Sequence, residues 1–234
     1  MRFQTPLIPA RLIRRYKRFL ADIELEDGSE VTAHCPNPGS MLGLSQPGTK
    51  IWVEPNNDWR KKLKYGWQLV DHENGHFTGI NTVLANKIVK EALIVKQLKG
   101  LDTYSTCRPE VKYARNSRID FLLTCSSNNA PDAYVEIKSV TLMRQSGLAE
   151  FPDGITDRGL KHLGDLSEVA KLGKRAVLLF LVQRSDCAAF AVASDIDPAY
   201  GKAYLELKQQ AIEIMVYSCA LSPYAIEVDK KLLI

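Results

Sequence analysis

The pattern of secondary-structure signals changes near residue 82, and this change limits the folds open to the 234-residue chain. Before it, short runs of β-forming residues alternate with turns rich in Gly, Pro and Asn, such as EDGSE (26–30) and QPGTK (46–50). About five short strands separated by such turns are typical of a small barrel. We therefore expect an all-β barrel over residues 1–82.

After residue 82 the signals of helices and strands alternate. Residues 81–100 place apolar side chains at spacings of three and four and predict a helix that ends at a glycine. Strand-like runs follow, then a predicted helix over about 156–172. RAVLLFLVQ (175–183) is a continuous apolar run, typical of a strand buried on both faces. This order predicts an α/β domain of mixed α+β type over residues 83–234, in which helices flank a mixed sheet.

One strand-like run, YVEIKSV (134–140), carries two charged residues in its middle. Glu136 and Lys138 lie two positions apart, so they share one face of a strand. The preceding run, SRIDFLL, carries Asp120, and the turn-rich stretch between the runs predicts an antiparallel hairpin. If the turn centres near Asn128, Asp120 lies opposite Glu136, with their Cβ atoms about 4.5–5.5 Å apart.

Two opposed carboxylates suggest a metal. Like charges opposite each other on a sheet are destabilising unless something lies between them. Mg²⁺ or Mn²⁺ suits such hard oxygen ligands. Asp120 and Glu136 are therefore predicted metal ligands, and Lys138 is predicted to orient a water molecule or stabilise a phosphate. The three would catalyse metal-assisted phosphodiester hydrolysis. The alternative is ordinary alternation, with Glu136 and Lys138 facing water.

Two clusters in the first 70 residues interleave cations with aromatic residues, RLIRRYKR (11–18) and WRKKLKYGW (59–67). This pattern suits a phosphate backbone with stacked bases, and an OB-type barrel, which fits the expected strands, often binds nucleic acid. The alternative is a solvated surface, because the net charge of +4 is mild. The cations predicted to contact nucleic acid are Arg14, Arg15, Lys17, Arg18, Arg60, Lys61, Lys62 and Lys64.

Composition narrows the location of the protein. No apolar run reaches the roughly 18 residues of a membrane span, and the N-terminal stretch lacks the apolar core of a secretory signal. The five cysteines are odd in number and form no CxxC pair, which argues against a disulfide framework or a zinc site. We expect a cytoplasmic protein with reduced thiols and no membrane association.

The charged residues also carry a family resemblance. Asp120, followed after fifteen residues by Glu136-Ile137-Lys138, resembles the core of PD-(D/E)XK nucleases, with Ile119 in place of the usual Pro. The blocks HCPNPGSM, NTVLANKIVKEA and FPDGITDRGLKHLGDL resemble the bacterial sugar fermentation stimulation protein A (SfsA) family. The resemblance implies an OB-like domain followed by a nuclease-like domain. It also implies DNA binding without strong sequence preference, linked to regulation of maltose metabolism, while the core implies nuclease activity.

The nuclease superfamily implies further site residues. A Glu on the helix before the sheet often contacts the metal, and Glu91 lies at that place. Its alternative is a solvent-facing helix residue, and Glu110 is a rival for the same role. The helix after the sheet commonly offers a polar residue, often Gln, where this chain has Leu160. The candidates that remain on that helix are Arg158, Lys161 and His162.

Residues 198–220 resemble a part of the family that has been read as a helix-turn-helix. A helix is predicted from Pro198 with Asp197 as its N-cap. The following IEIMVYSC, however, is β-branched and aromatic and predicts a strand. A helix-turn-helix needs a second helix to enter the major groove, so we expect none here.

Three functions remain open on these grounds. The first is a Mg²⁺-dependent nuclease, and the second is a DNA-binding regulator whose nuclease-like core is vestigial. The third, a carbohydrate-acting protein, rests only on the family's name. DNA is the expected partner, with RNA as a second, and the oligomeric state is left open.

Overall fold

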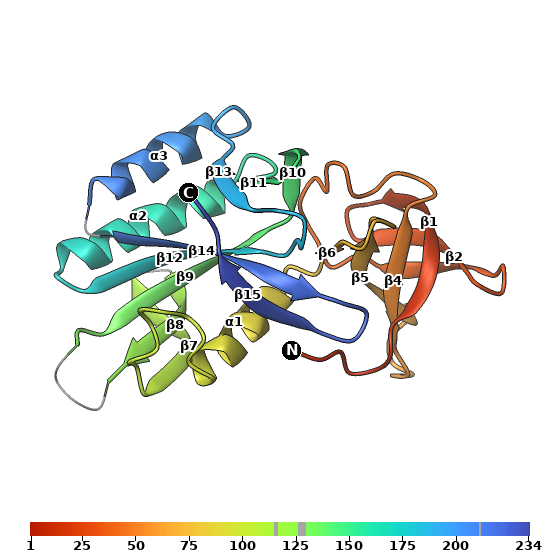
Figure 1. The fold of residues 1–234 in the computed structure, drawn as a ribbon, viewed down its shortest axis with the longest axis horizontal. Helices are drawn as coiled ribbons and strands as arrows, with labels where there is room; N and C mark the ends of the chain where they lie inside the picture. The colour runs from red at the N-terminus through yellow and green to blue at the C-terminus, as the bar shows by residue number, and fades with distance from the viewer. Residues whose placement is uncertain (115–116, 126–129, 211) are drawn as a thin grey trace.

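The computed structural model describes residues 1–114, 117–125, 130–210 and 212–234. Its first part is all β, and its second part combines helices with a sheet; the two lie side by side in Figure 1. None of the helices in the described ranges is both long and apolar enough to cross a membrane.

The first part is a closed barrel. Its strands follow the order β3-β2-β1-β4-β5-β6, and a parallel pairing of β3 with β5 closes the first five into a barrel. Alternation explains the closure: Ile51 and Val53 on β4 are fully buried in the barrel core with Trp67 on β5, whereas Trp52 between them is only half-buried. The predicted OB-like barrel is confirmed. Its strands are β1 (Ile8–Tyr16), β2 (Leu20–Leu25), β3 (Glu30–His34), β4 (Lys50–Pro55), β5 (Tyr65–Asp71) and β6 (Phe77–Gly79).

The second part is built on a six-stranded mixed sheet in the order β15-β14-β12-β9-β8-β7. The central strands β9, β12 and β14 run parallel, and the flanking pairs are antiparallel. On β12, every residue from Ala176 to Val182 is fully buried, as the apolar run predicts. The strands of this sheet are β7 (Thr106–Ala114), β8 (Ser117–Thr124), β9 (Ala133–Val140), β12 (Arg175–Val182), β14 (Ile212–Leu221) and β15 (Ile226–Lys231).

In the part of the chain that the structure describes, three helices cover this sheet, which confirms the predicted fold class. Helix α1 (Leu84–Ile94) packs on one face, and α2 (Asp157–Lys171) with α3 (Pro198–Lys208) packs on the other (Figure 1). A small additional sheet, which the sequence did not predict, lies beside them. Its strands are β10 (Leu142–Gln145), β11 (Leu148–Phe151) and β13 (Ala189–Val192).

The helix predicted over residues 81–100 is shorter in the structure. It ends at Ile94 because Lys96 takes a left-handed conformation with φ of 58°, and the N–H of Gln97 bonds back to the carbonyl of Ala92 at 2.9 Å. This is the Schellman arrangement, which usually needs a glycine at the left-handed position. The expectation that Gly100 ends the helix was therefore wrong.

The other helix boundaries agree with the sequence. Thr156 and Asp197 accept hydrogen bonds from the backbone N–H groups of Gly159 and Tyr200, so both act as N-caps. Strand β14 follows α3, in the place where a helix-turn-helix would need its second helix. The expectation that no such motif forms is confirmed.

Candidate active site

Strands β8 and β9 form the predicted hairpin. Phe121 pairs with Val135 in an antiparallel register. The paired residues end there, and the same register continued by one step would set Asp120 opposite Glu136, as the sequence predicts. The turn expected at Asn128 lies outside the described residues.

Asp120 is held in place by two donors. Its Oδ1 accepts a hydrogen bond from Asn86 on α1 at 2.8 Å, and its Oδ2 accepts one from the backbone N–H of Ile137 at 2.7 Å. Burial raises the pKa of Asp120 to about 6, and the charge of Glu136 adds to the shift. The two hydrogen bonds and Lys138 oppose it. The pair therefore repels, as the predicted opposition of two carboxylates requires.

Glu136 and Lys138 are buried, with 2% and 9% of their surface exposed, because α2 covers their face of the sheet. The alternative of a water-facing pair is thus excluded. Lys138 Nζ donates to Glu136 Oε1 at 2.8 Å. His162 Nδ1 contacts the same oxygen and lies 3.2 Å from Lys138 Nζ. Burial alone would raise the pKa of Glu136, but the hydrogen bond from His162 and the charge of Lys138 lower it.

The donor set fits a divalent cation. Within the described residues, Glu136 Oε2 is buried and has no hydrogen-bond partner, which is costly for a carboxylate. Asp120 and Glu136 offer hard oxygens, which Mg²⁺, Mn²⁺ and Ca²⁺ prefer. No cluster of three or more His, Cys, Asp or Glu side chains in the described ranges is arranged to hold a metal. A metal here would take two side-chain carboxylates and complete its shell with water, a common arrangement for Mg²⁺.

The structure does not bring the other predicted acids to this pair. Glu91 Oε2 lies 2.8 Å from the N-terminal ammonium of Met1. It follows Asn86 by five positions, about 140° around the helix, so Asn86 takes the place facing Asp120. Glu110 is exposed and has a positive φ of 53°. Sequence reasoning missed Asn86, whose only signal is its place five positions before Glu91 in the block NTVLANKIVKEA.

Of the candidates on α2, the structure brings His162 to the pair. Arg158 and Lys161 are exposed near the start of the helix. Arg158 also lines a cleft between the two parts of the molecule. The half-buried Leu160 stands where a Gln was expected, so His162 supplies the polar contact from this helix.

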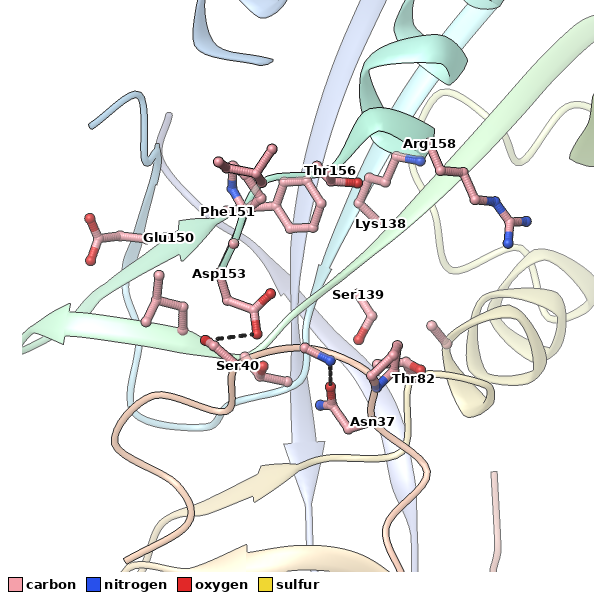
Figure 2. A pocket seen from close by; sticks show the side chains of 18 of the residues that line it. Asn37, Ser40, Thr82, Lys138, Ser139, Glu150, Phe151, Asp153, Thr156 and Arg158 are labelled. Atoms are coloured by element: carbon pink, nitrogen blue, oxygen red, sulfur yellow. Dashed lines mark hydrogen bonds between the residues drawn. The ribbon is translucent and has the colours of Figure 1, made fainter. Parts of the chain in front are cut away.

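Lys138 forms part of a cleft of about 750 Å³ between the two parts of the molecule (Figure 2). Its walls come from the barrel loop 37–40, the start of α1 and the segment 150–158. Asp153 of that segment reaches across to the barrel, where its Oδ2 accepts hydrogen bonds from Ser40 Oγ and the N–H of Met41 at 3.4 Å each. The cleft therefore joins the barrel to Lys138, the neighbour of the carboxylate pair.

The predicted cations lie on two loops of the barrel. Lys17 and Arg18 are exposed in the turn between β1 and β2, and Arg18 also lines the cleft. The second cluster lies in the loop 56–64 between β4 and β5, where Lys61 and Lys62 are exposed and line a second cleft of about 660 Å³. In OB-folds, the loops at these two positions bind oligonucleotides.

Arg15, which is predicted to contact nucleic acid, forms hydrogen bonds within the barrel. Its Nη2 donates to the backbone carbonyls of Arg18, Asn37 and Gly39 at 2.9 Å each. These bonds fix the loop 37–40 that forms one wall of the cleft. The nucleic-acid contact of Arg15 stays a prediction, and the guanidinium is already bonded to the backbone of the barrel.

Three more of the predicted cations have partners within the barrel. Arg14 pairs with Asp22 at 2.8 Å, and Arg60 pairs with Asp58 at 2.9 Å. Lys64 Nζ donates to the carbonyl of Asp58 at 3.2 Å. All three cations are exposed, so these contacts leave them open to a phosphate.

Comparison with known proteins covers both parts of the chain. The family model described as "SfsA N-terminal OB domain" matches residues 13–80, and the one described as "Sugar fermentation stimulation protein RE domain" matches residues 83–225. The sugar fermentation stimulation protein homolog of Ruegeria pomeroyi is 60% identical over 228 residues, which cover 97% of this chain and 98% of that protein. The homolog of Agrobacterium fabrum is 47% identical over 229 residues, 98% of this chain and 95% of that protein.

A solved structure extends the likeness to three dimensions. Pyrococcus furiosus SfsA, in complex with Ca²⁺, superposes with a TM-score of 0.87 at 26% sequence identity, covering 100% of this chain and 97% of that chain. Matches of this extent over sequence and fold leave one assignment: the chain belongs to the sugar fermentation stimulation protein (SfsA) family.

Proposed function

We propose that this protein hydrolyses phosphodiester bonds in nucleic acid with the help of a divalent cation. The observation that carries the proposal is the buried group of Asp120, Glu136 and Lys138 beside a cleft with a basic rim. Such a group is costly to bury for stability alone, because one carboxylate oxygen lacks a partner among the described residues and the two acids repel. Costly charges gathered beside a cleft are typical of a catalytic site.

Asp120 and Glu136 would hold the cation. The Ca²⁺ bound to P. furiosus SfsA supports a divalent ion in this fold, and Mg²⁺ or Mn²⁺ is the proposed ion for catalysis. When bound, such an ion makes a water molecule more acidic and neutralises phosphate charge. Lys138, held by Glu136, stabilises negative charge on a phosphate that enters the cleft.

In this proposal the barrel binds the nucleic acid. Its exposed cations contact phosphates, which carry no sequence information, so binding without strong sequence preference is the proposed mode. DNA is the proposed partner and RNA a second one, in the cytoplasm. Regulation of maltose metabolism would then act through contact with nucleic acid.

The test is metal-dependent cleavage. The full-length protein is incubated with single- and double-stranded DNA and with RNA, in Mg²⁺, Mn²⁺, Ca²⁺ or EDTA, and products are resolved on denaturing gels. We expect products in Mg²⁺ or Mn²⁺ and none in EDTA. Salt-sensitive binding without products on any substrate would contradict the proposal.

The second candidate function is a DNA-binding regulator with a vestigial core. One observation favours it: within the described residues, no third acidic side chain joins the pair Asp120 and Glu136. The assay above separates the two functions, because the regulator binds all these substrates without cutting them.

His162 is expected to act as a positioning residue. It contacts Glu136 Oε1 and thereby leaves Oε2 as the open oxygen. Loss of such a supporting contact typically costs about 10–100-fold in metal affinity or activity. We therefore expect His162→Ala to lower the metal affinity or the cleavage rate by this factor. His162→Gln keeps a hydrogen-bond donor and should recover most of the rate. The metal concentration at half-maximal rate checks this: an unchanged value in His162→Ala would leave His162 a purely structural residue.

A further inference from the structure

Two aromatic side chains are exposed on the barrel loops, each beside cations. Phe19 is 44% exposed and follows Lys17 and Arg18 in the turn between β1 and β2. Trp59 is 85% exposed and precedes Arg60 in the loop between β4 and β5. An exposed aromatic ring next to cations offers a surface on which a nucleic-acid base can stack.

Stacking of this kind selects the form of the nucleic acid. A base inside a duplex has both faces covered by its neighbours, whereas an unpaired base offers a free face. Both loops therefore suit a strand without its partner. Arg18 connects the turn between β1 and β2 to the cleft, since it lies on the same turn as Phe19 and also lines the cleft.

The cleft is too small to enclose a duplex. Its volume of about 750 Å³ falls within the range of pockets that enclose a drug-sized molecule, about 300–1,000 Å³. A compact space of that volume is about 9 Å across, less than the width of about 12 Å of the B-DNA major groove alone, so only a short stretch of one strand can be enclosed. Lys138 is nearly buried, so a phosphate must enter this space to reach it.

The contact across the cleft restricts it further. Asp153 packs so closely on the barrel loop that a Cβ atom added to Gly39 would lie 2.2 Å from its Oδ2. Together with the hydrogen bonds from Ser40 and Met41, this contact joins the segment 150–158 to the barrel (Figure 2). The cleft is thus bounded by both parts of the molecule, and Arg158 lines it from the start of α2.

We infer that the ligand of this surface is single-stranded nucleic acid, whose bases stack on Phe19 and Trp59 while its backbone passes Arg18 into the cleft. The cutting of that strand rests on the proposed function, but its binding does not. The substrate class is therefore an unpaired strand, a single-stranded end or an overhang.

The test measures binding without metal, with fluorescence anisotropy as the readout and EDTA in the buffer. The full-length protein is titrated into labelled single-stranded DNA longer than one OB-fold site, about 16 nucleotides, RNA of the same sequence and the blunt DNA duplex. We expect a single strand to bind roughly tenfold or more tightly than the duplex, and the DNA and RNA arms show which sugar is preferred. Phe19→Ala and Trp59→Ala should each weaken single-strand binding by roughly 5–100-fold.

The matched control is Tyr224→Ala, which removes an aromatic ring that is 81% exposed between β14 and β15 and should leave binding unchanged. Equal affinity for the duplex, or wild-type affinity in both Phe19→Ala and Trp59→Ala, would overturn the inference. Single-strand preference without cleavage would support the inference while removing the proposed function. Cleavage of a blunt duplex as fast as of an overhang in Mn²⁺ would keep the function and refute the inference.

Discussion

Asp120→Asn is expected to lower the rate of metal-dependent cleavage by about 100-fold or more, because the metal's transition-state stabilisation is worth several kcal/mol. The substitution removes the negative charge on one of the two proposed metal ligands but keeps the shape of the side chain. Its amide can still accept a hydrogen bond from the N–H of Ile137. The measurement is the initial rate of cleavage in Mn²⁺ over a range of metal concentrations.

Stability provides the control for this variant. Because the pKa of Asp120 is raised to about 6, the folded protein holds this proton more tightly than the unfolded chain does. Stability therefore falls as pH rises from about 4 to about 6, and the full penalty applies above that range. Metal-free Asp120→Asn avoids the penalty and should be more stable than wild type by about 2 kcal/mol at neutral pH and equally stable below about pH 4.

These two results together exclude misfolding as the cause of lost activity. Denaturant unfolding at several pH values measures the stability, and anisotropy with single-stranded DNA shows whether binding is kept within a factor of about two. An inactive but more stable variant supports the metal-site role of Asp120. Undiminished cleavage would refute it, whatever the stability.

The hairpin of the site was predictable because its register follows from alternation. Asp120 and Glu136 had to share a face once the two strands paired, and like charges facing each other are rare without a reason. The burial of Lys138 was not predictable from the strand itself. It depends on α2, which follows more than fifteen residues later in the chain and covers that face.

The residues that sequence reasoning misplaced show the same limit. Glu91 lies on the predicted helix, but the helix packs so that Asn86 faces Asp120 and Glu91 faces the N-terminus. Arg15 belongs to an evident basic cluster, yet its guanidinium is used by the backbone of a distant loop. Rotation of a helix about its axis and contacts between distant loops are tertiary properties, which spacing alone cannot supply.

Lys138→Met is expected to destabilise the protein by about 3–5 kcal/mol at neutral pH, the usual cost of breaking a buried ion pair. Glu136 is almost fully buried, and Lys138 Nζ lies 2.8 Å from its Oε1. Without that cation, Glu136 keeps its desolvation cost and loses much of the compensation. The measurement is the free energy of unfolding in denaturant without metal.

The pH dependence separates this cause from lost packing. In wild type the pKa of Glu136 is lowered, so its stabilising effect is present above the ordinary pKa of a Glu and is lost as pH falls through the lowered value. In Lys138→Met the charge and hydrogen bond of Lys138 no longer lower the pKa of Glu136, so this pKa rises relative to wild type while burial and the contact with His162 remain. The deficit relative to wild type should therefore shrink as pH falls from about 7 to about 4, since the protonated acid is cheap to bury.

Two further variants complete the argument. Lys171→Met breaks an exposed pair with Glu168, 2.7 Å apart, and should cost less than about 1 kcal/mol because water screens such pairs. Lys138→Met combined with Glu136→Gln should cost less than Lys138→Met alone, since no buried charge is left unpaired. If the double variant is instead destabilised by the sum of the effects of Lys138→Met and Glu136→Gln, the two side chains act independently. In that case the coupling free energy between Lys138 and Glu136 would be zero. The position of Lys138 beside the cleft would then need an explanation other than its pairing with Glu136.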